Sequence, residues 1–209
     1  MIDSILYGSF FKPPHCFYGI VLSPDIGYHP QCSSLQLLYQ YCDDNKIPIV
    51  FQKGINIYPS SESSNRSDFD NPQHIESIIK KYSNLKINIA SISISKSNEK
   101  RFDQILELLR ENDNVYIDLS CFRKRSELLY FHNYWSKNPK LHSRTLFATG
   151  YNLFCTGDNV FNLQKLFVNL KSIFSTQELH LLMHKNPIQF LGLLKDHRSM
   201  FHKKSISYA

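Results

Sequence analysis

Short apolar runs alternate with longer helical stretches along this 209-residue chain, and this alternation constrains its fold more than any other feature. Strands separated by helices are typical of βα units and a parallel sheet. Most runs are nearly continuous in apolar and β-branched residues, as expected for strands buried on both faces. The predicted strands cover 2–7, 18–23, 47–52, 86–92, 115–120 and 145–149. The sequence therefore predicts an α/β fold with about six parallel strands.

Helices are expected between these strands, and several have recognisable first residues. Asn71 and Pro72 supply a cap and a first-turn proline, and Ser175 and Glu178 have the spacing of a capping box. A last short helix is expected to open at Asn186 and Pro187 for the same reason. Other helices are predicted after Ser33 and Ser34, after Ser97, and over 123–136 and 158–174.

Size and composition favour one main domain. Hydrophobic residues make up 42% of the chain and aromatic residues 13%, which is enough for a substantial core. No run of eighteen apolar residues is present, so no membrane span is expected, and the first residues lack the pattern of a secretory signal. Five scattered cysteines without C-x-x-C spacing favour free thiols in a reducing compartment. We therefore expect a cytoplasmic protein.

The basic residues concentrate at the C-terminal end of the sequence. The net charge is +6, and residues 195–209 hold four basic side chains against one acidic side chain. We interpret 1–194 as the domain and 195–209 as a basic tail, more typical of a solvated end than of a nucleic-acid arm. A nucleic-acid binder that acts through this tail is the weakest functional hypothesis, because the rest of the chain has no basic stripe interleaved with aromatic residues.

Seven segments resemble, in the same order, the characteristic segments of one enzyme family. They are 2–8 (IDSILYG), 19–24 (GIVLSP), 45–52 (NKIPIVFQ), 83–93 (SNLKINIASIS), 114–120 (NVYIDLS), 144–151 (RTLFATGY) and 186–193 (NPIQFLGL). Together they resemble the metal-dependent amidohydrolases of the amidohydrolase-related, decarboxylase-like branch. This resemblance implies a TIM-like (β/α) barrel of the metal-dependent hydrolase type.

The residues that bind the family's divalent metal have no equivalent here. Carried over position by position, the family's four histidines and one aspartate correspond to Ile5, Tyr7, Gln52, Ser91 and Gly150. Gln52 and Ser91 offer neutral oxygens, Tyr7 would have to ionise, and the other two have no donor side chain. The loss of the aspartate also removes the expected base. The resemblance therefore implies no metal cofactor and no catalytic residue.

The chain is also short for the fold that the resemblance implies. A TIM barrel typically needs about 250 residues, and ten residues separate the first predicted strand from Gly19, where the family has two further βα units. We therefore expect an incomplete or shortened barrel with open edges. A second copy or another protein is expected to complete it, unless the barrel closes at a smaller size.

Two functional hypotheses follow. The first is a binding or assembly module without metal or hydrolase activity, and the alternative is an active hydrolase with a rebuilt site. Asp118 could be a pocket carboxylate or could bond nearby backbone donors, and Cys121 could be a nucleophile only beside a base, so a buried thiol is favoured. Further pocket candidates are Lys53, which a solvent-facing position also explains, with Ser120 and Tyr151. No small-molecule ligand is indicated.

The histidines offer no recognisable metal motif. His180 and His184 are four residues apart on a predicted helix, a geometry that can hold metal, but no glutamate follows His180, and surface histidines are favoured. His15 with Cys16 and His29 with Cys32 lack zinc-motif spacing and are interpreted as surface residues. A polar stretch at 59–70 is interpreted as a loop on the sheet edge where barrel enzymes place their active sites.

Overall fold

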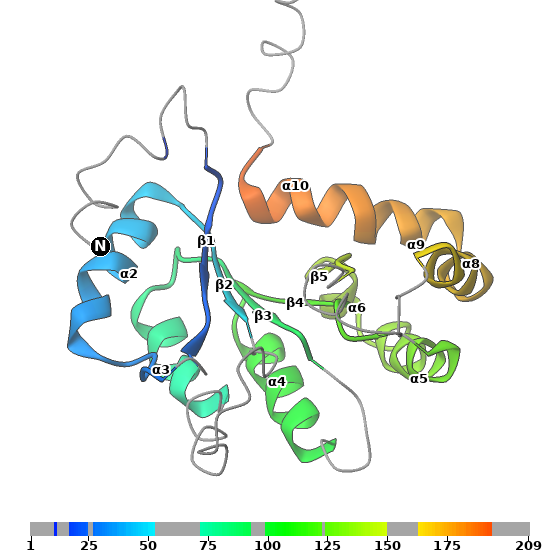
Figure 1. The fold of residues 1–209 in the computed structure, drawn as a ribbon, viewed down its shortest axis with the longest axis horizontal. Helices are drawn as coiled ribbons and strands as arrows, with labels where there is room; N and C mark the ends of the chain where they lie inside the picture. The colour runs from blue at the N-terminus through cyan, green and yellow to red at the C-terminus, as the bar shows by residue number, and fades with distance from the viewer. Residues whose placement is uncertain are drawn as a thin grey trace, which may run out of the picture.

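The computed structural model describes residues 11, 17–24, 27–52, 72–92, 99–122, 124–149 and 163–193 (Figure 1). Within them, one parallel sheet has the strand order β1-β2-β3-β4-β5, so each strand pairs with the next along the chain. The strands are β1 (Ile20–Leu22), β2 (Ile49–Gln52), β3 (Ile87–Ala90), β4 (Val115–Asp118) and β5 (Thr145–Leu146). All five lie inside predicted strands; the remaining predicted strand, 2–7, lies outside the described residues, as do 59–70 and 195–209.

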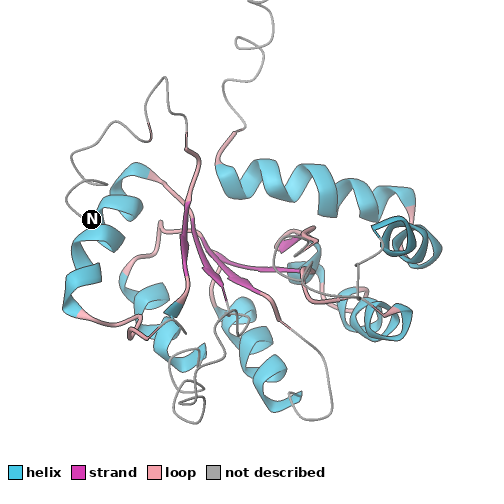
Figure 2. Ribbon diagram, in the orientation of Figure 1, coloured by secondary structure: helices cyan, strands magenta, loops and turns pink. Residues whose placement is uncertain are grey.

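Helices follow the strands as the sequence predicts, with one short addition, α6. Figure 2 shows them arranged around the curved sheet. They are α2 (Ser33–Asn45), α3 (Pro72–Lys81), α4 (Glu99–Glu111), α5 (Arg125–Trp135), α6 (Pro139–His142), α8 (Leu163–Ile173), α9 (Thr176–His180), the π-helix η3 (Leu181–Lys185) and α10 (Asn186–Leu191). None of these helices is long and apolar enough to span a bilayer.

The two faces of the sheet have different partners. On one face, Ile49, Ile87 and Val115 stand in register and join a large core with the helices around the sheet. On the opposite face, which we call the inner face, Val50, Asn88 and Tyr116 stand in register. The inner face is covered by α10, since the Phe190 ring packs on Tyr116 at a centroid distance of 5.0 Å.

The glycine that opens the 19–24 segment is required by a close approach. A Cβ on Gly19 would lie 2.9 Å from the carbonyl oxygen of Pro48, which accepts a hydrogen bond from the Ile20 N–H. Any larger residue would push β1 away from β2. This glycine therefore serves the pairing of the two strands.

The predicted last short helix is present as α10 (Asn186–Leu191), but it does not begin after a break in the chain's helical course. Instead, α9, η3 and α10 follow one another directly from Thr176 to Leu191, and we call this continuous stretch the terminal helix. The start of this helix is Ser175, and its predicted capping box with Glu178 is present. Pro187 has no N–H and would break a regular α-helix. Instead, the chain widens into the π-helix η3, in which the N–H of Asn186 reaches the carbonyl of Leu181.

Because Pro187 has no N–H to donate to a carbonyl of the preceding helical turn, the carbonyl of Leu182 can bond to the sheet instead. It accepts a hydrogen bond, at 3.0 Å, from the N–H of Phe147, the residue directly after β5. The buried side-chain amide of Asn186 donates to the carbonyls of His142 and Thr145, at 2.7 and 2.8 Å. The terminal helix is therefore bonded to the β5 end of the sheet.

The other end of the terminal helix is fixed at β3. The Lys86 ammonium donates to the carbonyl of Gln189, and the helix ends at Gly192 with a φ of 74°, the left-handed conformation usual after a helix. Burial, together with Lys46, lowers the pKa of Lys86. The terminal helix thus crosses the inner face and is held on both sides (Figure 1).

Candidate functional site

Two of the five positions that correspond to family metal ligands are described, and both lie where the strands of the sheet end. Gln52 ends β2 opposite Ala90 of β3, and Ser91 follows Ala90 directly. Asp118 is the last residue of β4, at the same carboxyl-terminal end of the sheet. We call Gln52, Ser91, Asp118 and Ser120, with Asn88, the mouth cluster. The other pocket candidates, Ile5, Tyr7, Lys53, Gly150 and Tyr151, lie outside the described residues.

Asp118 is the centre of the mouth cluster, and its carboxylate is surrounded by donors from its own chain. Its Oδ2 accepts from the Asn88 amide at 2.9 Å. Its Oδ1 accepts from the backbone N–H of Ser91 at 3.2 Å, from the N–H of Ser120 at 3.0 Å and from the Ser120 hydroxyl at 2.5 Å. Two of these four bonds come from backbone N–H groups, the kind of donor named in one of the two interpretations from the sequence, and the other two come from side chains.

Ser91 takes the unusual backbone conformation that this network requires. Its φ is 58°, in the left-handed region that costs a serine about 1 kcal/mol or more. In this conformation its N–H donates to both Asp118 and the Ser120 hydroxyl, the latter at 3.1 Å. Its own hydroxyl lies 3.4 Å from that of Ser120. The residue at the place of a family histidine thus forms part of the internal network.

Asn88 is the member of the mouth cluster that the sequence interpretation missed. It is 4% exposed, and its Oδ1 has no hydrogen-bond partner among the described residues. The available signal was an amide in the middle of the apolar run 86–92, because a polar residue in a buried strand normally has a specific partner. That partner, Asp118, is thirty residues away in the sequence.

The chemistry of the described mouth residues does not fit a catalytic divalent metal. Gln52 offers a neutral amide and Ser91 a neutral hydroxyl, whereas zinc sites use thiolate, imidazole and carboxylate ligands. The one carboxylate of the cluster already accepts four hydrogen bonds. Across the described ranges, no three His, Cys, Asp or Glu residues gather closely enough to hold an ion.

The cysteines differ from one another in their surroundings. Cys121 is partly exposed, so the expectation of a buried thiol is wrong; it lies in the turn that follows β4 rather than within a strand or helix. Cys42, on the inward side of α2, is fully buried, and burial raises its pKa to about 12. Cys42 therefore stays a neutral thiol, and its role is packing.

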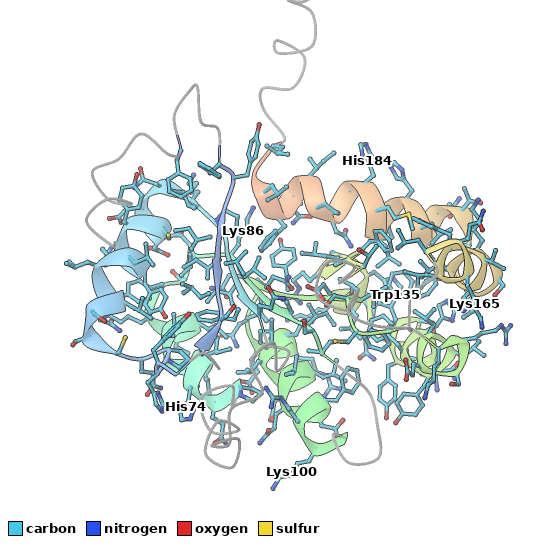
Figure 3. All side chains as sticks on the ribbon, viewed as in Figure 1. His74, Lys86, Lys100, Trp135, Lys165 and His184 are labelled. Carbon is cyan, nitrogen blue, oxygen red and sulfur yellow. The ribbon has the colours of Figure 1, made fainter. Side chains whose placement is uncertain are left out.

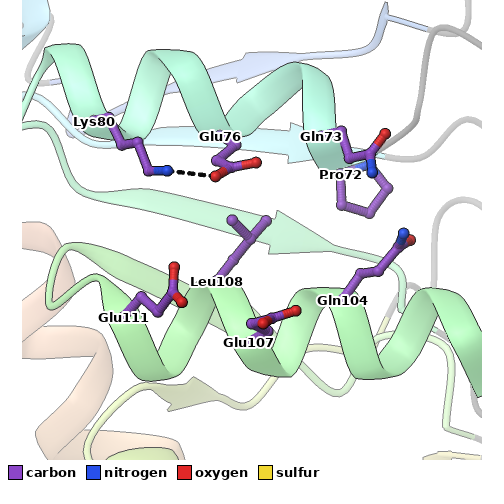
Figure 4. A pocket seen from close by; sticks show the side chains of 8 residues that line it. All are labelled: Pro72, Gln73, Glu76, Lys80, Gln104, Glu107, Leu108 and Glu111. Atoms are coloured by element: carbon purple, nitrogen blue, oxygen red, sulfur yellow. Dashed lines mark hydrogen bonds and ion pairs between the residues drawn. The ribbon is translucent and has the colours of Figure 1, made fainter.

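A separate groove lies between α3 and α4, on the outside of the helix layer (Figure 4). It has a volume of about 340 Å³ and carries the carboxylates of Glu76, Glu107 and Glu111, of which Glu76 pairs with Lys80 at 2.5 Å. None of the mouth cluster lines this groove. It is therefore not the counterpart of the family's active site.

Solved structures with a similar fold are TIM-barrel and amidohydrolase-type proteins. An uncharacterised TIM-barrel protein from Bordetella bronchiseptica aligns with a TM-score of 0.61 and 20% identity, over 84% of this chain and 57% of its own. A 4-oxalomesaconate hydratase from Rhodopseudomonas palustris aligns with a TM-score of 0.59 and 11% identity, over 91% and 60%. A dihydroorotase from Campylobacter jejuni aligns with a TM-score of 0.54 and 18% identity, over 91% and 61%.

These likenesses confirm an incomplete TIM-like barrel, because this chain spans 57–61% of the length of the three structures. No curated protein sequence matches the chain. The family model described as amidohydrolase matches residues 17–193, which include every described strand and helix. The chain therefore belongs to the amidohydrolase family.

Proposed function

We propose that this chain is a non-catalytic amidohydrolase that uses part of the family's barrel as an assembly module. One observation carries the proposal: the mouth carboxylate, Asp118, is occupied by donors from Asn88, Ser91 and Ser120. A carboxylate that binds a metal or acts as a base needs a free lone pair directed at the ion or the substrate. To serve in either way, Asp118 would have to leave buried N–H and O–H donors without partners.

Charge supports the same conclusion. A divalent ion needs anionic or strongly donating ligands, because a dehydrated charge in a protein interior is costly without them. The two described residues at family ligand positions, Gln52 and Ser91, are both neutral. A rebuilt hydrolase site would therefore need its charged groups from elsewhere than these positions.

Elemental analysis tests the non-catalytic proposal. Full-length, tag-free protein that has passed through gel filtration is expected to retain no stoichiometric zinc, manganese or iron that depends on Asp118. The alternative, an active hydrolase with a rebuilt site, predicts about one ion per chain and its loss in Asp118→Asn. That second result would refute the proposal.

The proposed role in assembly is based on a difference between the two outer strands of the sheet, β1 and β5. At β5, the terminal helix covers the edge through the bond from Phe147 to Leu182. β1 pairs with β2, and among the described residues it has no strand on its other side. Val21, in the middle of β1, is 59% exposed, and Tyr18, which precedes β1, is 45% exposed. An exposed apolar parallel edge is a site at which another strand adds.

We propose that a second copy of the chain pairs along β1. Contact between the same edge of two copies covers both open edges at once, which is the usual arrangement of a two-fold dimer. Such a contact would also cover the exposed Val21 of each copy.

Charge placed on this edge is expected to separate the two copies. Val21→Lys should shift a dimer to a monomer in sedimentation velocity, because an edge lysine opposes strand addition. Leu37→Lys is the matched control: Leu37 is 66% exposed and belongs to α2 rather than to β1, and its variant should stay dimeric. A wild-type chain that sediments as a compact monomer at every concentration would contradict the assembly proposal.

A further inference from the structure

Two histidine side chains lie together on the free side of the terminal helix. The ring centroids of His180 and His184 are 4.9 Å apart, with an angle of 51° between the ring planes. Both side chains are exposed, which confirms the surface position expected from the sequence. Figure 3 shows His184 projecting from the helix on the side away from the sheet.

The distance between the rings matches that of two imidazoles on one ion. With metal–nitrogen bonds of about 2.0–2.1 Å and ligand angles between square and tetrahedral, the two ring centroids lie roughly 4.5–5.2 Å apart. The observed 4.9 Å falls within this interval.

The other close histidine pair does not have this geometry. His29 and His74 are in edge-to-face contact, with ring centroids 4.2 Å apart, shorter than the interval for a shared ion. The Nε2 of His74 is buried. This pair therefore resembles a packing contact.

The backbone that carries His180 and His184 is fixed on its inner side. Between them, Leu182 is fully buried and its carbonyl is bonded to Phe147, while Asn186 is bonded to two carbonyls near β5. The helix therefore does not have to order itself when a ligand binds, so the entropic cost of binding is small.

We propose that His180 and His184 form a binding site for a divalent late transition-metal ion, with water in the remaining coordination positions. Imidazole ligands suit Cu²⁺, Ni²⁺ and Zn²⁺ rather than Mg²⁺ or Ca²⁺, which prefer oxygen ligands. The affinities follow the usual order for nitrogen ligands, with Cu²⁺ bound more tightly than Ni²⁺ or Zn²⁺. The site is separate from the mouth cluster, because the terminal helix carries none of its members.

Isothermal titration of the full-length, tag-free chain with Cu²⁺, Ni²⁺ and Zn²⁺ tests this site. One ion per chain is expected at the site, with Mg²⁺ giving no heat. Removing a group that only supports a metal ligand weakens metal binding about 10–100-fold. His180→Ala and His184→Ala each remove a ligand itself, so each should weaken metal binding by at least that much.

Two matched controls decide where the ion binds. Lys185→Ala changes an exposed neighbour on the same helix, and His29→Ala removes a histidine from the other close pair; both are expected to bind like the wild type. Circular dichroism shows whether each variant is folded, as expected for the exposed helix positions His180, His184 and Lys185 and for the loop position His29. Unchanged binding in His180→Ala and His184→Ala, or loss of binding in His29→Ala instead, would overturn the proposal.

Discussion

Replacing Asp118 with alanine is expected to lower the free energy of unfolding by roughly 3–5 kcal/mol, since several buried donors each lose about 1–3 kcal/mol when left without an acceptor. The affected donors are the side-chain amide of Asn88, the N–H of Ser91 and both donors of Ser120. All three residues are at most 5% exposed, so water cannot replace the lost carboxylate easily. Urea unfolding followed by circular dichroism measures the loss.

The sign of this change separates a structural carboxylate from a functional one. Residues kept for catalysis are often replaced without loss of stability, or with a gain. Asp118→Asn keeps one acceptor oxygen and should fall between the wild type and the alanine variant. Asp103→Ala, at an exposed position on α4, should change the unfolding free energy by less than about 0.5 kcal/mol. A stabilised Asp118→Ala variant would mean that the carboxylate is retained for chemistry.

The second large effect is expected at Asn186, and we expect Asn186→Ala to lower the unfolding free energy by about 2–4 kcal/mol. The amide donates to two carbonyls, those of His142 and Thr145, and Asn186 is 1% exposed. Alanine would leave both carbonyls without this donor. The melting temperature should fall by roughly 2–4 °C for each kcal/mol, the scale for a chain of this size.

Gln189 supplies the control for this experiment. It lies one turn further along α10, its side chain is exposed, and its contact to Lys86 uses the backbone carbonyl, which alanine retains. Gln189→Ala should therefore unfold like the wild type. If Asn186→Ala also unfolds like the wild type, the bonds from Asn186 do not hold the terminal helix to the sheet.

Most of the fold could be predicted because its signals are local. A strand buried on both faces must be apolar along its whole length, so the runs 47–52 and 115–120 enclose β2 and β4. Caps are equally local: Pro72 opens α3, and Ser175 with Glu178 opens the terminal helix. These features depend on neighbouring residues, and the sequence displays them directly.

The candidate site was harder to predict, because its bonds join residues distant in the sequence. Gln52 and Ser91 could be placed at the carboxyl-terminal end of the sheet, since parallel strands all end on the same side. The role of Asp118 could not be decided, because it depends on the alignment of β3 with β4, which brings Asn88 and Ser91 to the carboxylate. No local pattern encodes that alignment.

The terminal helix shows where a local rule fails. Asn186 followed by Pro187 has the pattern of a helix start, because a first-turn proline loses no hydrogen bond. In the structure the proline sits within a helix, and its missing N–H is compensated by the π-helix η3 and by the donor from Phe147. Tertiary contacts to β5 thus override the local preference.

The central claim is that hydrogen bonds within the mouth cluster satisfy the Asp118 carboxylate, and that the cluster does not hold a metal. Its most direct test is a crystal of the full-length chain soaked in Zn²⁺, with diffraction data collected at the zinc absorption edge. We predict no anomalous peak within coordinating distance of Asp118, Ser91 or Gln52, with Asp118 still bonded to Asn88 and Ser120. An anomalous peak bound by the Asp118 carboxylate would contradict the account.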